Sequence, residues 1–417
     1  METLNINGIK VSLIPDNRLK TAALTVYISL PLNKDAASFN ALWPAVLMRG
    51  CKKYPETKEL NIYMEQLFGA TAGFRVEKQG ANQLVSMRFK TVSDVYAEGK
   101  PFTKLIRLAG EILFNPLIEN GAFRKSYTDR EKQVQIQYIE GLVNDKRKYA
   151  ATRLIQEMCK DEEYSILACG EAEKIEKIDE KALYESYISA LKEGSISVYV
   201  TDHFDKDEIV PVLEEVFANS PHGEKVLRIP VVKEAPEKVK TVEEKAPVTQ
   251  GKLSMGFRTS ITRTSQEYYA MMLFNKLFGG SPYSKLFLNV REKLSLAYYA
   301  SSTYGSLKGI VTVNSGIEFE KYEAAKNEIL VQLNEMKKGN FTEDEINAAK
   351  LDIENSYKEI SDYGEALSEY YSYLDCAGIS ESPSEVVAKI KTVTKEQIVN
   401  AAKTVNLDTV YFLKGEE

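Results

Sequence analysis

The sequence predicts an α+β protein made of two homologous α/β-sandwich halves, in each of which helices cover one sheet. Two observations lead to this fold class. Each half begins with strand-like stretches, continues with amphipathic helix patterns and returns to a strand near its end. A segment rich in Pro, Lys and Glu separates two portions of similar length. Strands followed by helices and a returning strand favour a sheet packed under a helical layer.

The domain organisation follows from the length and from the linker. A chain of 417 residues is too long for one core, and domains of roughly 150 residues each suggest two to three of them. We expect an N-terminal half at 1–220, a linker at 221–250 and a C-terminal half at 251–417. Prolines and alternating charges in the linker favour an extended, solvated connector.

In the first half, strands are expected at 10–14, 23–29 and 196–200. A helix pattern covers 105–112, and a second helix, capped near residue 179, leads into the last strand. The apolar positions of these helices recur every three or four residues. That spacing places them on one buried face.

The second half repeats this layout, with strands expected at 252–257 and 409–413. Between them, apolar residues from 322 to 336 recur at spacings of 3, 4, 4 and 3, which predicts a long helix with one buried face. Thr342 and Thr394 each precede a Glu or Gln by three positions, as in the capping boxes that open helices.

Composition excludes several classes of protein. Lys+Arg 54 against Asp+Glu 60 gives a net charge of −6 with no basic block, so a nucleic-acid partner is not expected. No apolar run reaches the length of a membrane span, and the first residues have no secretory signal. The four cysteines lie far apart without a C-x-x-C pair, which favours thiols in a reducing compartment. We therefore expect a cytoplasmic protein without a membrane partner.

The histidine inventory limits the chemistry further. His203 and His222 are the two histidines, and both are expected in loops. No H-x-x-E-H pair can be written, and G-x-S-x-G, G-x-G-x-x-G and the P-loop motif are absent from the sequence. The residues therefore predict a chain that cannot carry out hydrolysis alone.

One motif in the second half resembles a known family. The stretch Gly280-Ser281-Pro282-Tyr283-Ser284-Lys285-Leu286-Phe287 leads into Val290-Arg291-Glu292-Lys293-Leu294-Ser295-Leu296-Ala297-Tyr298. It is similar to the C-terminal signature of the insulinase/pitrilysin family, in the branch of the mitochondrial processing peptidase. Ser295 stands where that family usually has glycine. The resemblance implies mainly antiparallel sheets and two clam-like halves joined by a charged linker.

In that family, the first half carries H-x-x-E-H on a helix, followed by a glycine and a distal glutamate. Counting back from Gly50, the two histidine positions hold Ala41 and Ala45, and the glutamate position holds Pro44. The distal glutamate position falls on Tyr138. Alanine cannot ligate zinc, and no carboxylate remains to activate water. We therefore expect no metal or other cofactor in this chain.

The resemblance implies that Arg291 and Tyr298 hold a peptide near its scissile carbonyl, at the zinc site of a partner. Arginine and tyrosine provide directional donors that suit a developing oxyanion. The expected function is a non-catalytic subunit of a two-chain zinc peptidase, whose partner is a paralogue bearing H-x-x-E-H. The alternative is a structural or peptide-holding scaffold. Without the resemblance, the residues alone would favour a simpler interpretation, in which Arg291 is a surface arginine and Tyr298 is a half-buried strand tyrosine.

Two further stretches leave alternatives open. Residues 67–76 match the family's edge strand, which pairs with substrate backbone, although Ala72 replaces the expected asparagine. An ordinary hairpin strand with Phe74 in the core is the expected alternative. A second stretch has tyrosines that either line a peptide chamber or pack a helix: Tyr363, Tyr370, Tyr371 and Tyr373.

Overall fold

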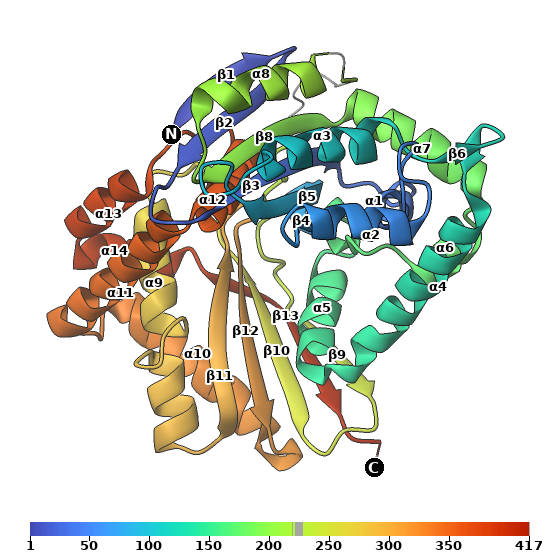
Figure 1. Cartoon of the computed structure of the whole chain (residues 1–417). Coiled ribbons are helices and arrows are strands. Elements are labelled where there is room, and N and C mark those ends of the chain that lie inside the picture. Colours follow the sequence, from blue (N-terminus) through green and yellow to red (C-terminus); the bar gives the residue numbers. More distant parts are fainter. Residues whose placement is uncertain (219, 222–227, 417) are drawn as a thin grey trace. The chain divides into compact units, whose positions relative to one another are not determined.

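The computed structural model describes residues 1–218, 220–221 and 228–416 (Figure 1). These residues form two compact units. The first combines Met1–Glu140, Ile166–Arg228 and Ile360–Gly378, and the second combines Gly141–Ser165, Ile229–Glu359 and Ile379–Glu417. Within the described ranges, no helix has both the length and the apolar composition needed to cross a bilayer.

The first unit is built on a six-stranded sheet with the order β1-β2-β8-β3-β5-β4. β2 and β8 are parallel, and all other neighbours are antiparallel. The strands are β1 (Glu2–Ile6), β2 (Ile9–Pro15), β8 (Ser195–Asp202), β3 (Thr21–Pro31), β5 (Asn82–Val92) and β4 (Thr71–Gln79). The expected strands at 10–14, 23–29 and 196–200 are confirmed.

Side chains alternate between the two faces of this sheet, as the period of a β-strand requires. Leu24, Val26 and Ile28 of β3 belong to the main core. The helices that share this core include α1 (Ala37–Leu47), α2 (Thr57–Gln66), α3 (Pro101–Phe114), α6 (Ala172–Glu176), α7 (Glu180–Glu193) and α8 (Lys206–Phe217). Tyr27 points to the other face, where its hydroxyl lies 3.2 Å from that of Ser368 on α12 (Gly364–Ala377).

The second unit repeats this sheet with the order β11-β12-β10-β13-β9. Its strands are β11 (Ala297–Gly305), β12 (Ile310–Ile317), β10 (Gly251–Arg258), β13 (Asn406–Lys414) and β9 (Lys240–Lys245). Its helices include α9 (Tyr268–Phe278), α10 (Tyr322–Lys338), α11 (Glu343–Asp362), α13 (Pro383–Thr392) and α14 (Lys395–Lys403). β9 and β13 are parallel, as β2 and β8 are in the first sheet. Starting from the parallel pair, the order β9-β13-β10-β12-β11 corresponds to β2-β8-β3-β5-β4 of the first sheet. This correspondence confirms the predicted fold class.

The predicted helix starts are also confirmed. Thr394 accepts from the Gln397 N–H at 3.3 Å, while its own N–H donates to the Gln397 side chain at 2.8 Å. Thr342 and Glu345 form the same reciprocal pair at the start of α11. Local chemistry of this kind satisfies backbone donors that a helix leaves unbonded.

Each half contributes one helix to the other half's sheet. α5 (Lys146–Met158) comes from the first half but packs on β10 and β13, and α12 comes from the second half but packs on β3 and β8. At Gly256 of β10, an added Cβ would lie 2.5 Å from Sδ of Met158. Glycine therefore allows α5 to approach this strand closely. The two compact units therefore do not coincide with the two sequence halves, because α5 belongs to the second unit and α12 to the first.

A buried cluster of charges fastens the segment after α5 to the second sheet. The Glu162 carboxylate accepts from Nη2 of Arg258 at 2.7 Å and forms an ion pair with Lys308. Nε of Arg258 donates to Asp408 at 2.5 Å. All four side chains are at most 7% exposed, so each charge depends on the others for compensation.

The segment expected as a linker, 221–250, differs from a free connector. Residues 222–227, which include His222, lie outside the described residues. Residues 240–245 form β9, which adds to the sheet beside β13. The prediction of a solvated connector is therefore wrong for this stretch, because alternating exposed and half-buried side chains let it pair as an edge strand.

Candidate functional site

Helix α1 carries the positions at which the family resemblance places the zinc ligands. Ala41 and Ala45 lie one turn apart, and Ala41 is only 2% exposed. Pro44 lies inside the helix and is buried. A methyl group cannot bind zinc, and proline provides neither a carboxylate nor a backbone N–H. This part of α1 therefore has a packing role.

A network of buried amides lies along the same helix. Nδ2 of Asn40 donates to Gln83 at 3.0 Å, and Gln83 donates to the carbonyl oxygens of Ala37 at 3.0 Å and Ala168 at 2.7 Å. Nε1 of Trp43 donates to Asn40 at 3.3 Å. Buried polar groups require such partners. These amides are therefore used to hold α1 against β5.

The fourth erased position, Tyr138, lies on α4 (Lys125–Gly141) with 57% of its surface exposed. Glu131 of the same helix is buried and pairs with Arg49 at 2.5 Å. Across 1–218, 220–221 and 228–416, no group of three or more His, Cys, Asp or Glu side chains could hold a metal ion. The residues present do not fit the zinc ion that is bound in catalytic members of the family.

The remaining candidate groups for chemistry in the first half do not form a site. His203 follows β8, and its Nδ1 lies 3.2 Å from the Tyr96 hydroxyl at the surface. The thiols of Cys51 and Cys159 are buried, and neither forms a disulfide with a described residue. Burial raises the pKa of the Cys51 thiol, which makes it a poor nucleophile.

Arg291 lies on the short π-helix η3 (Leu286–Lys293). Its guanidinium stacks 4.6 Å from the centre of the Phe287 ring, and its Nε lies 3.4 Å from Glu292. The arginine side chain is still 42% exposed. The ring restricts the direction of the side chain, while much of the donor fork faces solvent.

Tyr298 lies at a β-bulge at the start of β11. Its neighbours Ala297 and Tyr299 pair with Ile317 and Gly316, so Tyr298 is the extra residue between them. It is 59% exposed. Bulges redirect a side chain, and they are frequent on edge strands next to binding sites. β11 is such an edge strand.

The turn between Arg291 and Tyr298 is well anchored. The Leu296 N–H donates to the Val290 carbonyl at 2.9 Å. Ser295 has a φ of 48°, in the left-handed region that glycine adopts more easily. This backbone conformation suits the glycine that the family resemblance expects at the position. The predicted pair therefore flanks one ordered turn, although no hydrogen bond joins the two side chains among the described residues.

The predicted edge strand in the first half is β4, the last strand of its sheet. Phe74 is 37% exposed, so the alternative that placed it in the core is wrong. The reason is that β4 is the last strand of its sheet, with β5 as its neighbour on one side. The predicted tyrosine stretch divides: Tyr363, at the N-cap of α12, is 60% exposed, whereas Tyr371 of α12 packs beside Tyr199.

A pocket of about 290 Å³ lies beside β4, and the sequence did not point to it. Arg75, Arg88 and Lys90 line it together with Glu365 and Glu369 of α12. No motif marks these residues. The signal that could have found them is the alternation of polar and apolar residues along 84–90.

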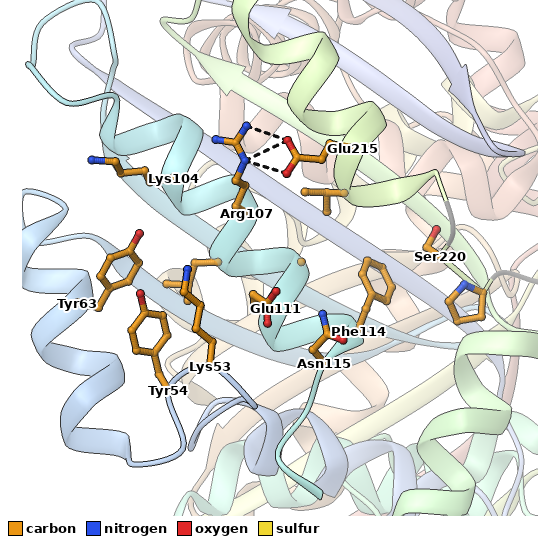
Figure 2. A pocket seen from close by; sticks show the side chains of 14 residues that line it. Lys53, Tyr54, Tyr63, Lys104, Arg107, Glu111, Phe114, Asn115, Glu215 and Ser220 are labelled. Carbon is orange, nitrogen blue, oxygen red and sulfur yellow. Dashed lines mark hydrogen bonds and ion pairs between the residues drawn. The ribbon is translucent and has the colours of Figure 1, made fainter.

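A larger pocket of about 660 Å³ lies on the helical side of the first sheet (Figure 2). Figure 2 shows the Arg107 guanidinium of α3 facing the Glu215 carboxylate of α8, with their closest approach at 2.8 Å. The rings of Tyr54 and Tyr63 stack 4.6 Å apart, and Lys53 lies over Tyr54 at 5.5 Å. The ion pair joins α3 to α8, and the stacked rings join α2 to the loop before it.

Comparisons with known proteins agree with this geometry. The family described as Peptidase M16 inactive domain matches residues 177–352. A protein of Bacillus subtilis (strain 168), named "Probable inactive metalloprotease YmfF", is 38% identical over 415 residues, which cover 98% of this chain and 96% of that protein.

Two solved structures are similar over the whole chain. A conserved protein from Enterococcus faecalis V583 has a TM-score of 0.91 at 28% identity and covers 100% of this chain and 98% of its own. A peptidase M16 inactive domain from Pseudomonas fluorescens has a TM-score of 0.78 at 19% identity and covers 99% and 97%, so it shows the fold alone.

Proposed function

Because this chain belongs to the peptidase M16 family as a non-catalytic member, we propose that it is the pseudo-peptidase subunit of a two-chain zinc metallopeptidase. Its partner is a paralogue that bears H-x-x-E-H and holds the zinc ion. The substrate is an unfolded peptide or leader segment. This chain contributes Arg291 and Tyr298 to the binding of that peptide and binds no cofactor itself.

The observation that carries the proposal is the contrast between two regions of the chain. The zinc helix holds a buried alanine and a buried proline where catalysis needs a ligand and a carboxylate. The turn with Arg291 and Tyr298, in contrast, presents both side chains to solvent. A protein that served only as a scaffold would have no need for an exposed arginine and a bulged tyrosine on one ordered turn.

The chemistry of these two side chains suits a peptide carbonyl. Arginine brings a permanent charge and several N–H donors in a fixed plane, and tyrosine adds one O–H donor. Donors aimed at a developing oxyanion lower the barrier most where water is excluded. In the proposed complex, the zinc ion of the partner activates water, while Arg291 and Tyr298 bind the peptide and its carbonyl oxygen.

The proposed setting is the bacterial cytoplasm, in line with four cysteines that form no disulfide among the described residues. The chain resembles bacterial members linked by name to 5-aminopentanol modification of elongation factor P, which occur beside a paralogue with an intact motif. That neighbourhood supplies the partner for the experiment.

The test is hydrolysis of a quenched-fluorescence peptide library by the purified chain, by the zinc-bearing paralogue, and by their mixture. Activity that requires the mixture and is lost with a chelator supports the proposal. A stable complex without activity indicates a scaffold. Activity of this chain alone would refute the assignment as a non-catalytic subunit.

Matched variants assign the role to the two residues. Arg291→Ala and Tyr298→Phe should each lower turnover by the mixture by about 100-fold, the cost of removing one oxyanion donor. Size-exclusion chromatography should show that assembly is intact. The controls are Arg130→Ala, at another exposed arginine, and Tyr138→Phe, at a tyrosine that is 57% exposed. If the control variants lose as much turnover as Arg291→Ala and Tyr298→Phe, the proposed role of Arg291 and Tyr298 in peptide binding is refuted.

A further inference from the structure

The pocket beside β4 is lined by residues of β3, β4 and β5 and of α12, and it includes Thr25 and Tyr27 of β3 and Ala72 and Phe74 of β4. We call it the β4 pocket. On β4 it contains Thr71, Gly73 and Arg75, on β5 Ser86, Arg88 and Lys90, and on α12 Glu365 and Glu369. An adjoining pocket of about 360 Å³ shares Arg75, Arg88, Lys90, Glu365 and Glu369. All of these residues belong to the first unit.

Strand register explains why these side chains meet. Gly73 lies opposite Arg88 and Thr71 opposite Lys90 in the antiparallel pair. Val85, Met87 and Phe89 alternate with the pocket residues and are buried in the main core. Since successive side chains point to opposite faces, Ser86, Arg88 and Lys90 must point away from that core.

Gly73 leaves a gap in this face. A Cβ added there would have no atom within 4 Å, and Gly73 is not among the glycines with positive φ. The glycine is therefore not required by the backbone or by close packing. Its consequence is an opening of side-chain size directly beside Arg88.

Arg88 has a donor that the protein does not use. Its side chain is 27% exposed and forms an ion pair with Glu365, but its buried Nε has no hydrogen-bond partner among the described residues. Burial lowers the pKa of Arg88, and the nearby Arg75 lowers it further. A buried, unsatisfied donor is costly, so an acceptor that reached this atom would be bound favourably.

The other charges around the pocket are loosely paired. Arg75 lies 3.4 Å from Glu369, with both side chains more than half exposed. Lys90 lies 3.6 Å from Asp202. The Arg75–Glu369 pair is exposed and contributes little, so it can exchange partners when a charged ligand enters. The Asp202 carboxylate beside Lys90 is, in contrast, buried.

The pocket opens at the free edge of β4. This strand has nine residues, and among the described residues it pairs with β5 alone. A peptide that paired with the free edge would place alternate side chains about 5 Å from those of β4, on the same face. Gly73 offers no side chain at its position, so one peptide side chain can pass over it toward Arg88.

We propose that the β4 pocket is a subsite for one acidic side chain of an extended peptide, in which the carboxylate accepts a hydrogen bond from Nε of Arg88. Glutamate fits better than aspartate because its longer side chain spans the gap over Gly73. The inference rests on the proposed function, since it assumes that the chain binds peptides. It names the substrate class as peptides with a glutamate at one fixed position.

The test is fluorescence anisotropy with labelled peptides of one length, in which a single glutamate is moved along a neutral sequence. The full chain is used, alone and with its paralogue. We expect one position at which Glu binds about tenfold more tightly than Gln, the size of a single charge-assisted hydrogen bond. Lys at that position should bind more weakly than Gln.

Two variants separate the pocket from the fold. Gly73→Leu fills the gap, and Gly73→Ala fills it only in part. Gly73→Leu should abolish the preference for Glu over Gln, with unchanged melting temperature and unchanged binding of the Gln peptide, whereas Gly73→Ala should keep much of the preference. Arg88→Gln should reduce the preference to about twofold or less.

The outcomes distinguish the two proposals. Equal binding of Glu and Gln peptides at every position would overturn the acidic subsite and leave peptide binding in place. Tighter binding of the Lys peptide would also overturn the acidic subsite, because it would mean that Glu365 and Glu369 of the pocket bind a basic side chain. If no peptide binds, alone or with the paralogue, both the subsite and the proposed function fail.

Discussion

Replacement of Glu162 by glutamine tests the buried charge cluster of the second unit. The variant keeps the shape of the side chain but removes the charge that faces Arg258 and Lys308. Asp408 still compensates Arg258, at 2.5 Å. Lys308, which is 3% exposed, loses its carboxylate partner and keeps the Val231 carbonyl. We expect a loss of about 3–5 kcal/mol in the free energy of unfolding, as for other broken buried pairs.

The assay is urea denaturation followed by circular dichroism, with Asp161→Asn as the matched control. Asp161 is an exposed neighbour of Glu162, and its replacement should change stability by less than about 0.5 kcal/mol. A second variant, Glu162→Gln with Lys308→Met, removes both members of the pair. It should be more stable than Glu162→Gln alone, because no unpaired buried charge remains. A loss below about 1 kcal/mol for the single variant would refute the reasoning.

The same site predicts a dependence on pH. Burial acts to raise the pKa of Glu162, but hydrogen bonds from Lys308 and Arg258 outweigh it and hold the pKa below its usual value. A carboxyl with a lowered folded-state pKa stabilises the fold above its unfolded pKa, about 4.3, and loses this contribution as the pH falls through the folded-state pKa. The wild type should therefore lose more stability than Glu162→Gln between roughly pH 5 and pH 3.

Three further predictions concern the first unit. Pro44→Ala should stabilise the protein by about 1–3 kcal/mol in urea denaturation, because it restores a helix N–H; a destabilised variant would contradict this. The triple variant Ala41→His, Pro44→Glu and Ala45→His should bind far less than one zinc per chain by elemental analysis. The reasons are that Ala41 is buried and that no distal carboxylate completes the site. One zinc per chain would show that replacing these three residues is enough to restore the metal site. Gly170→Ala should cost about 2–4 kcal/mol, because the residue has a φ of 79° and its Cβ would lie 2.7 Å from Cα of Ser38; an unchanged urea midpoint would contradict the clash.

Local features of the fold were predictable from the sequence. The capping box at Thr394 depends on residues three positions apart, and both of its hydrogen bonds are present. The strands at 23–29 and 252–257 follow from short apolar runs whose length favours a strand over a helix. The family motif identified Ser295 as unusual, because glycine is expected there. Its φ of 48° lies in the left-handed region that glycine adopts more easily than serine.

Features that depend on distant neighbours were not predictable. The apolar face of α12 shows that the helix is buried but not which sheet buries it. Phe74 has the residue type and spacing of a core position, and only its place on the outermost strand leaves it exposed. Arg88 was missed because its importance comes from the absence of a side chain at Gly73, on another strand.

The exchange of α5 and α12 has a consequence for synthesis on the ribosome. The face of the first sheet that contains Tyr27 and Tyr199 is completed by α12, whose last residue is Ala377. Nearly the whole polypeptide must therefore leave the exit tunnel before the first sheet is covered. During translation, this nascent sheet exposes apolar surface of the kind that chaperones bind. A gene split at the linker would leave both polypeptides in that unfinished state.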